Sequence, residues 1–370
     1  MNRLILSPCG TSILTNNAPQ DLRALVFKYA NALKTVSGDE GQKLFSHLEN
    51  RRKEILALSP EDAAKFSAEL NGIYHLYNGD FSSGTKDTHI LLATDTWLGR
   101  ETARIVEAWL QGKGINNVQI WDDIGGLRTD NLHNFHCAVA ELVRRLHETL
   151  PGYKDSGYQI IFNLTGGFKS IQGILQTLAQ FYADEAVYIF ETSKELLRIP
   201  RLPLTLDILP TIEKHLKTWR RLALGLSVDP ESCQEIPDSF LLKIDNDIAL
   251  SPWGELVWQQ SKRKIYEKRF WEPPSDRITW SKDFEKAVNE LPPDRRYEIN
   301  KRMDELALHL ERADHPNPRS LHCHKLSGAP PFPGCTHEIY AWSDRNAARI
   351  FGICYGHKKF EIKHFAGHLK

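Results

Sequence analysis

The sequence predicts two fold classes in one chain: an N-terminal α/β domain with a mostly parallel sheet and a C-terminal α+β domain, joined by a helical region. Three observations lead to this prediction. Strand-like and helix-like runs alternate through residues 1–208, two helical patterns precede four strand-like runs after residue 276, and Pro273-Pro274 interrupts the chain between them. We therefore expect three parts, residues 1–208, 209–275 and 276–370.

The N-terminal sheet is predicted from five short apolar runs, each followed by small or polar residues. The expected strands are residues 3–6, 89–93, 118–121, 158–162 and 186–190. Helical periodicity predicts a helical insertion at about 19–85 and helices at 99–111, from after 128 through 150, and at 171–181. A proline-rich segment, residues 198–210, is expected to be extended and to end the domain. This alternation is typical of a Rossmann-like, doubly wound sheet.

The rest of the chain has different periodicities. Residues 211–226 and 253–270 are expected to be helices of the middle region, while 227–252 show no single pattern. After a short strand at 278–280, helices are predicted at 281–291 and 293–310. Hairpin-like strands are then predicted at residues 321–326, 337–342, 348–355 and 359–365. The C-terminal domain is therefore expected to place two helices on an antiparallel sheet.

Composition narrows the class of protein and its compartment. The 370 residues have a formal net charge of +0 and a hydrophobic fraction of 41%, so any binding of nucleic acid would depend on local patches. Six cysteines without a repeated spacing indicate reduced thiols in a cytoplasm. We find no signal peptide and no apolar run long enough to span a bilayer, so we expect a cytoplasmic protein without membrane contact.

Residues 163–170, Asn-Leu-Thr-Gly-Gly-Phe-Lys-Ser, lie between a predicted strand and a predicted helix. Glycines at such a turn let a ligand approach the backbone closely, and the first amides of a helix favour an anion. Lys169 adds a positive charge, and Asn163, Thr165 and Ser170 add neutral hydrogen-bonding groups. The stretch therefore predicts a site for a phosphate or a nucleotide. The alternative is an ordinary turn followed by a solvated lysine.

Two known phosphate-binding patterns do not fit this stretch. The Walker loop needs four residues between its first glycine and a Gly-Lys pair, and the dinucleotide fingerprint is absent as well. The prediction depends instead on polar residues at three further strand ends, residues 9–12, 94–96 and 122–126. Because ligands of doubly wound sheets bind at the carboxyl ends of the strands, we expect all four segments to lie along one edge.

The last four strands contain residue types suited to cleaving a phosphodiester without a metal. Such a reaction needs a base near the 2′-hydroxyl, cations for the developing charge and an acid for the leaving oxygen. The candidate residues are Arg349, Lys325, Tyr340, Lys363, His364 and His368. One alternative is a solvated sheet face. The other is a zinc site formed by residues 322–324 with Cys335 and His337, whose spacing matches no common zinc signature.

The N-terminal residues resemble the CARF domain of CRISPR-associated effectors, through Ser-Pro-Cys-Gly-Thr-Ser at 7–12 and Asn-Leu-Thr-Gly-Gly-Phe-Lys at 163–169. Domains of that family dimerise and bind a cyclic oligoadenylate across the two-fold axis. The resemblance implies that such a ligand, made by a type III CRISPR complex, contacts both motifs here. The pocket residues expected at this edge are Cys9, Gly10, Thr11, Ser12, Thr94, Asn163, Thr165, Gly166, Gly167 and Lys169.

The C-terminal segment, from about residue 276, resembles a RelE-type toxin. The similarity lies in the two helices, Lys-Leu-Ser-Gly at 325–328, His-Glu-Ile-Tyr at 337–340 and Ala-Arg-Ile-Phe at 348–351. Members of that family enter the ribosomal A site and cut mRNA there. Arg349 matches a family arginine, whereas the family's strand lysines are replaced around Glu338 and Tyr340. For the missing acid and base we consider His364, His368 and Lys370.

Together the two resemblances imply a homodimeric CARF–RelE mRNA interferase of CRISPR immunity. A cyclic oligoadenylate, expected to be cyclic tetra-adenylate because of the two-fold axis, would activate ribosome-dependent cleavage of mRNA without a metal or other cofactor. Binding would act through the middle region. Two alternatives stay open: the N-terminal pocket degrades the ligand itself, or the chain is a ligand-sensing regulator that binds nucleic acid without cutting it.

Overall fold

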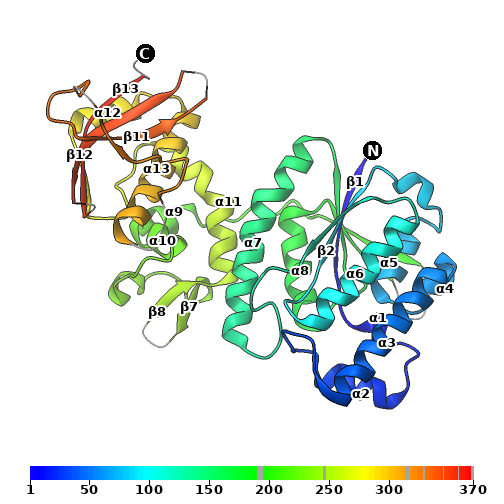
Figure 1. The fold of residues 1–370 in the computed structure, drawn as a ribbon. Helices are drawn as coiled ribbons and strands as arrows, with labels where there is room; N and C mark the ends of the chain where they lie inside the picture. The colour runs from blue at the N-terminus through cyan, green and yellow to red at the C-terminus, as the bar shows by residue number, and fades with distance from the viewer. Residues whose placement is uncertain are drawn as a thin grey trace. The chain divides into compact units, whose positions relative to one another are not determined.

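The computed structural model describes residues 1–189, 195–244, 247–312, 317–327, 330–344, 346–356 and 358–367. The chain forms two compact units, Met1–Thr205 and Leu206–Lys370 (Figure 1). The predicted middle and C-terminal regions both belong to the second unit.

The first unit is built on a six-stranded sheet with the order β3-β2-β1-β4-β5-β6. Its strands are β1 (Arg3–Pro8), β2 (Thr88–Leu92), β3 (Asn117–Trp121), β4 (Gln159–Asn163), β5 (Glu185–Ile189) and β6 (Leu196–Pro200). Neighbouring strands are parallel, except that β6 is antiparallel to β5. The predicted α/β class with a mostly parallel sheet is therefore confirmed.

The strand β6 corrects one sequence prediction. We expected residues 198–210 to be merely extended, but Leu197 and Arg198 pair with β5 in register. β6 lies at the edge of the sheet, where Pro200 at the end of the strand is tolerated because one side of an edge strand has no partner. Phe190, the predicted end of β5, lies outside the described residues.

Helices cover both faces of this sheet (Figure 1). The predicted insertion between β1 and β2 contains α1 (Ser12–Thr15), α2 (Gln20–Lys28), α3 (Gly38–Ala57), α4 (Pro60–Ala64), α5 (Ala68–Leu76) and the 3-10 turn η1 (Phe81–Gly84). The other helices are α6 (Trp97–Gly112), α7 (Leu132–Asp155) and α8 (Lys169–Tyr182). α7 and α8 lie on one face, and α3, α5 and α6 lie on the other.

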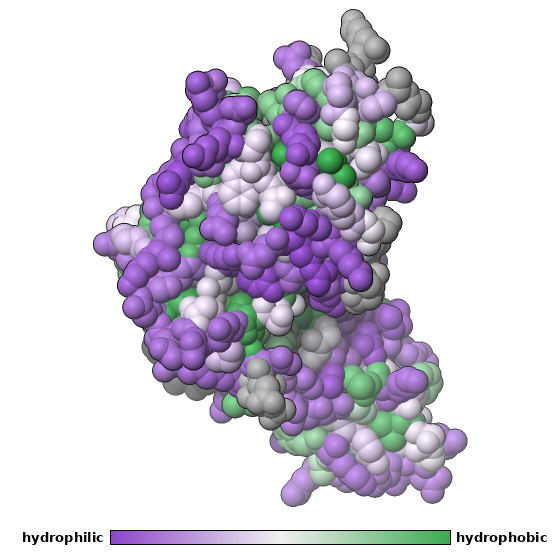
Figure 2. Space-filling model, turned by 90° about the vertical axis from the view of Figure 1, so that its left-hand side faces the viewer, coloured by the Kyte–Doolittle hydropathy of each residue, from purple (hydrophilic) through white to green (hydrophobic). Residues whose placement is uncertain are grey.

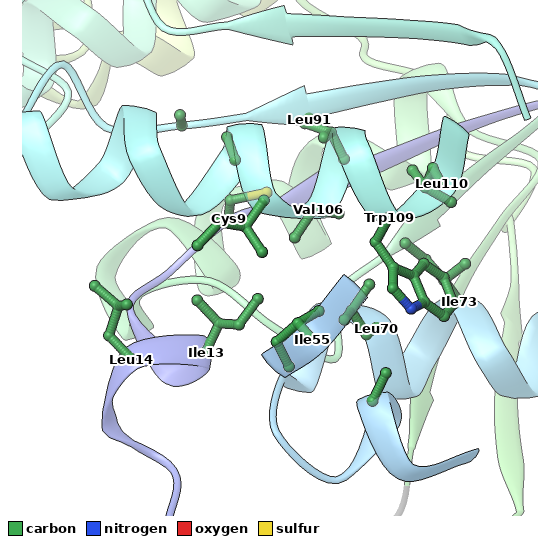
Figure 3. Packing of buried hydrophobic residues seen from close by; sticks show 14 of the residues in the cluster. Cys9, Ile13, Leu14, Ile55, Leu70, Ile73, Leu91, Val106, Trp109 and Leu110 are labelled. Carbon is green, nitrogen blue, oxygen red and sulfur yellow. The ribbon is translucent and has the colours of Figure 1, made fainter. Parts of the chain in front are cut away.

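Apolar side chains from α5, α6 and β2 pack in one buried cluster (Figure 3). Leu70, Leu91, Val106 and Trp109 are each at most 1% exposed. Burying a side chain of this size contributes roughly 1.5–3 kcal/mol relative to exposure. The apolar side of α5 is thereby fixed to the core, which determines where the polar side chains of its first turn lie.

The strand order reverses at β1. From β1 the chain builds β2 and then β3 on one side, and β4 pairs on the other side of β1, with Leu6 opposite Phe162. The carboxyl ends of β1 and β4 therefore flank the switch point, where doubly wound sheets bind ligands. The two segments singled out in the sequence, residues 9–12 and 163–169, follow these two strands.

The middle region, at the start of the second unit, contains more elements than the sequence predicted. The helix expected at 211–226 is divided into α9 (Leu209–Lys214) and α10 (Leu216–Ala223), because His215 adopts φ −116° and ψ 29°, outside the helical range. Residues 227–252 form η2 (Pro230–Cys233), η3 (Asp238–Phe240) and a hairpin of β7 (Leu241–Ile244) and β8 (Asp247–Leu250). α11 (Pro252–Lys268) confirms the second predicted helix.

The C-terminal region has the predicted α+β arrangement. Its sheet has the order β10-β11-β12-β13-β9; the β13–β9 pair is parallel and the other three pairs are antiparallel. The elements are β9 (Ile278–Trp280), α12 (Lys282–Asn289), α13 (Pro293–Glu311), β10 (His324–Lys325), β11 (His337–Trp342), β12 (Ala348–Tyr355) and β13 (Lys359–Gly367). Ile339, Ile350 and Ile362 of the sheet pack with Met303 and Leu306 of α13.

β10 is shorter than the strand expected at 321–326. The side chain of Asn317 accepts a hydrogen bond from the amide of Cys323 at 3.0 Å and donates one to its carbonyl at 2.6 Å. These bonds use the backbone groups of Cys323 that a longer strand would need for pairing with β11.

A buried ion pair joins the middle region to the C-terminal helices. Arg220 of α10 is 0% exposed and Asp304 of α13 is 3% exposed, and the guanidinium Nε donates to the carboxylate at 2.7 Å. Arg220 also donates to the carbonyl of Asn300 at 3.0 Å. Tyr266 of α11 donates to the other carboxylate oxygen at 2.5 Å, and burial raises the pKa of this hydroxyl. Three helices thus share one charged centre.

The face shown in Figure 2 is mostly hydrophilic, and its hydrophobic residues form small, separate patches. Across the described ranges, no helix combines the length and the apolar character needed to cross a bilayer.

We predict that Asp304→Asn destabilises the second unit by about 3–5 kcal/mol, because it leaves the Arg220 charge buried without its counter-charge. Urea denaturation followed by tryptophan fluorescence measures the change. Asp238→Asn is the matched control, since the Asp238–Lys243 pair is 85% and 63% exposed and should matter by less than about 1 kcal/mol. Equal stability of the two variants would contradict this role.

Candidate functional site

The carboxylate of Glu69 connects the loops that follow β1 and β4. Glu69 lies in the first turn of α5 and is 1% exposed. One of its oxygens accepts hydrogen bonds from the amides of Gly10 at 2.8 Å and Gly167 at 2.9 Å. The other accepts from the hydroxyls of Ser12 at 2.9 Å and Ser67 at 2.6 Å. Four donors therefore converge on one buried anion at the switch point of the sheet.

Glycines allow this close approach. A Cβ on Gly166 would lie 2.5 Å from the Glu69 carboxyl group, and one on Gly72 would lie 2.1 Å from the side-chain oxygen of Asn163. Gly167 has φ +94°, in the left-handed region that favours glycine. The predicted glycine turn is thus present, and it packs against α5.

Several predicted ligand residues have internal partners in this arrangement. The amides of Gly10 and Gly167 donate to Glu69, so they are not free donors for a phosphate. Asn163 is 0% exposed and its amide group donates to the Ser7 hydroxyl and to the Glu69 carbonyl, both at 3.2 Å. The hydroxyl of Thr165 accepts from the amide of Ile189 at 3.2 Å. These residues therefore hold the two loops together by internal hydrogen bonds.

The first turn of α8 provides the exposed residues at this edge of the sheet. Lys169 and Ser170 are exposed, and Lys169 has no ion-pair partner among the residues that the structure describes. Phe168 at the N-cap position gives no side-chain cap to the helix, so first-turn amides stay available to an anion. Thr11 is half-buried next to Ser12 on the neighbouring loop.

Cys9 and Thr94 have structural environments. Cys9 is 0% exposed in the cluster of Figure 3, where burial, followed by the nearby charge of Glu69, raises the pKa of its thiol well above the usual value. The hydroxyl of Thr94 pairs with that of Thr96 at 2.8 Å, and Thr96 caps α6 through the amide of Gly99. Neither side chain is exposed.

The ends of β2 and β3 are joined by a second carboxylate. Asp95 accepts from the amide of Gly126 at 2.8 Å and from the guanidinium of Arg128 at 2.5 Å. The four polar strand ends therefore form two pairs, one tied by Glu69 and the other by Asp95.

In the C-terminal sheet, one face is buried against the helices and the opposite face bears the polar residues. The register places Tyr340 opposite Arg349 on β12 and Glu338 opposite His324 on β10. The guanidinium carbon of Arg349 lies 3.6 Å from the centre of the Tyr340 ring, and its Nε lies 3.9 Å from Glu338. His324 Nε2 lies 3.2 Å from the same carboxylate oxygen. Arg349 and Tyr340, both predicted, are thus brought together with two residues that were not.

Arg349 is held firmly in this position. It is 7% exposed, and one of its terminal nitrogens donates to the carbonyls of Trp342 at 3.3 Å and Ala348 at 3.1 Å. The cation is therefore pre-oriented under the polar face, with the Tyr340 ring stacked on it.

His364 and Lys363 belong to the neighbouring strand β13. His364 lies opposite Phe351 and stacks on Phe332, with ring centres 4.5 Å apart. Lys363 pairs with Glu361 at 2.6 Å, next to the bulge in β13. His364 thus shares the polar face, whereas Lys363 has its own counter-ion.

Lys325 is not part of this group. Lys325 is exposed at the edge of the sheet and lies opposite His337, so the pleat places it on the other face from His324. His368, Lys370 and Gly328 lie outside the described residues.

The zinc alternative finds no grouped ligands. Among the described residues, no three His, Cys, Asp or Glu side chains are arranged as metal ligands would be. Burial, with a smaller effect of the nearby Cys354, raises the pKa of the Cys323 thiol to about 12.

Sequence reasoning missed Glu69 and misjudged Glu338. An acidic residue just after an N-cap serine is a recognisable helix start, but Gly10 and Gly167 are 59 and 98 residues away from Glu69. On sequence alone, Glu338 enters only as a difference from the strand lysines of the RelE-type family. Its two-residue spacing from Tyr340 places both side chains on one face of the strand, and that signal was available.

We predict that Glu69→Ala destabilises the first unit by about 3 kcal/mol or more, because each buried donor left unsatisfied costs roughly 1–3 kcal/mol. Glu69→Gln keeps an acceptor oxygen and should lose less. Glu148→Ala, on the exposed side of α7, is the control and should stay within about 0.5 kcal/mol of the parent protein. Thermal unfolding measures all three, and a Glu69→Ala protein as stable as the control would contradict the role of this carboxylate.

Comparison with known families adds one finding. Residues 64–202 match the model of a family described as CRISPR-associated protein (Cas_APE2256), a CARF-type family. The matched segment contains Glu69, β2 to β6 and the loop after β4, and it covers less than half of the chain. No curated protein matches the sequence. The match supports the predicted CARF-type, CRISPR-associated character for residues 64–202, and it does not extend to the C-terminal sheet.

Proposed function

We propose that the chain is an effector of CRISPR immunity in which a cyclic oligoadenylate, bound by the N-terminal unit, switches on cleavage of mRNA at the ribosome by the C-terminal unit. One observation supports this most strongly: a CARF-type segment shares its chain with a sheet whose polar face groups Arg349, Tyr340, Glu338 and His324. The first supplies a sensor, and the second supplies residues suited to metal-independent phosphodiester chemistry.

In this proposal the cyclic oligoadenylate binds at the edge of the sheet where β1 and β4 end. Glu69 already satisfies the amides of Gly10 and Gly167, so the phosphates of the ligand would contact Lys169 and the first turn of α8. Both groups favour an anion. A ring of four adenylates has a two-fold axis, and two copies of this edge, one from each chain of a homodimer, would bind it symmetrically.

In the same proposal the mRNA is cleaved at the polar face of the C-terminal sheet. Cleavage by the 2′-hydroxyl places extra negative charge on the phosphorus oxygens in the transition state, and a pre-oriented cation stabilises that charge. Arg349 is the cation held for this role. The ribosome would supply the aligned mRNA in its A site, as the resemblance to RelE-type toxins implies.

The middle region would transmit the signal within the second unit. Its helices α10 and α11 share the buried Arg220–Asp304–Tyr266 centre with α13, and α13 packs against the C-terminal sheet. A change imposed on the middle region by the sensor would therefore reach the sheet directly.

The test is a translation reaction with purified ribosomes, a defined mRNA and the full chain, with and without cyclic tetra-adenylate, in which new 5′ ends are mapped. We expect cuts at A-site positions only when the ligand is present. Arg349→Ala should lower the cleavage rate about 10²–10³-fold without changing ligand binding. Lys169→Ala should raise the ligand concentration needed about tenfold, whereas Lys53→Ala, an exposed lysine on α3, should not.

Other outcomes would replace parts of the proposal. Cleavage of free RNA without ribosomes would make the second unit a general ribonuclease. Loss of the cyclic ligand without any cut mRNA would assign the chemistry to the N-terminal unit. Salt-sensitive binding of nucleic acid with no cleavage would indicate a regulator.

A further inference from the structure

His324 has oxygen acceptors at both ring nitrogens. Nδ1 lies 2.8 Å from the carbonyl oxygen of His322, and Nε2 lies 3.2 Å from the Glu338 carboxylate. A neutral imidazole has one N–H and therefore satisfies one of these acceptors, whereas the imidazolium has two. The imidazolium is the form of the ring that can donate a proton.

The backbone around this ring is also specialised. His322 has φ +45°, in the left-handed region that non-glycine residues seldom adopt, and this conformation presents its carbonyl to His324 Nδ1. The His322 ring contacts those of His324 and Tyr340, with ring centres 4.5 and 4.6 Å apart. Strained residues of this kind cluster at functional sites, and the three rings together form a platform beside Arg349.

Among the residues that the structure describes, the charged and titratable groups around His324 come from its own segment and from two neighbouring strands. Glu338 and Tyr340 come from β11, Arg349 comes from β12, and His322 belongs to the same segment as His324. Glu338 is shared between His324 and Arg349, because the same oxygen lies 3.2 Å from the former and 3.9 Å from the latter. One carboxylate thus lies near both side chains on the same face of the sheet, and the His324 side chain is 40% exposed and accessible.

We propose that His324 is the general acid of the mRNA cleavage and that Glu338 is the residue that positions it. The inference rests on the proposed function. In the reaction, the 2′-oxygen forms a bond to phosphorus and its proton passes to water, while the bond from phosphorus to the 5′-oxygen breaks. For this step the Nε2–H of His324 turns from the Glu338 carboxylate to that oxygen and gives up its proton, which leaves a 2′,3′-cyclic phosphate, a free 5′-hydroxyl and a neutral imidazole. Arg349 stabilises the charge on the phosphorane.

The test compares an ordinary mRNA with one in which sulfur replaces the 5′-oxygen at the A-site cleavage position. A thiolate leaves without being protonated, so loss of a general acid matters little for the sulfur substrate. His324→Ala should cleave the ordinary mRNA about 10²–10⁴-fold more slowly than the parent protein, and the sulfur mRNA at a rate within about tenfold of it. The alkaline fall of the parent pH profile should vanish in His324→Ala.

Two further variants complete the experiment. Glu338→Gln should lower the rate on the ordinary mRNA less than His324→Ala does, with partial recovery on the sulfur substrate. His215→Ala is the matched control, because His215 forms a second histidine–glutamate pair, with Glu235 at 3.0 Å, in the middle region; it should cut at the parent rate. Thermal unfolding checks that each variant folds.

The outcomes distinguish a wrong proposed function from a wrong assignment of the general acid. If the parent protein makes no cuts with ribosomes and activator, the proposed function is wrong. If the parent cuts and His324→Ala cuts equally fast, the general-acid assignment is wrong while the function stands. A slow His324→Ala that the sulfur substrate does not rescue also overturns the assignment, because the residue then acts in another way.

Discussion

The architecture of the first unit depends on a buried carboxylate that takes the place of a bound anion. Glu69 accepts four hydrogen bonds from two loops and from its own N-cap serine, at the point where the order of the strands reverses. In many doubly wound sheets the amides at such a point bind the phosphate of a ligand. Here α5, a helix of the insertion between β1 and β2, supplies the negative charge instead, and the insertion thereby joins the two loops of the proposed ligand site.

The second unit uses carboxylates for a related purpose. Asp304 holds a fully buried arginine among three helices, and Glu338 holds His324 and Arg349 on the polar face of the sheet. In both places an anion fixes the orientation of cations that would otherwise sample many rotamers. The first pair unites the middle region with the C-terminal helices, and the second holds Arg349 and His324 together on the face where cleavage is proposed.

The elements that sequence reasoning predicted well are those with a local physical signal. Apolar runs and helical periodicity locate β1 to β5, α6 to α8 and the C-terminal sheet, since burial of one face imposes these patterns. The edge strand β6 was missed because prolines and exposed side chains hide its pattern, and the break at His215 has no local marker such as proline or glycine.

The candidate sites depend on contacts between distant parts of the chain. The sequence predicts the glycine turn at 166–167 but not its partner, Glu69. Glu69 reaches this turn because Gly72 lets α5 pack closely against Asn163. Likewise, the pairing of His324 with Glu338 follows from the register of β10 and β11, which composition alone does not fix.

The most direct test of the account is a calorimetric titration of the full chain with cyclic tetra-adenylate. In the proposed dimer, two copies of the edge formed by the ends of β1 and β4 bind one symmetric ring through Lys169 and the start of α8. We therefore expect saturation at about one ring per two chains, and a loss of binding when Lys169 is changed to Glu. No heat of binding, one ring per single chain, or unchanged affinity in Lys169→Glu would contradict it.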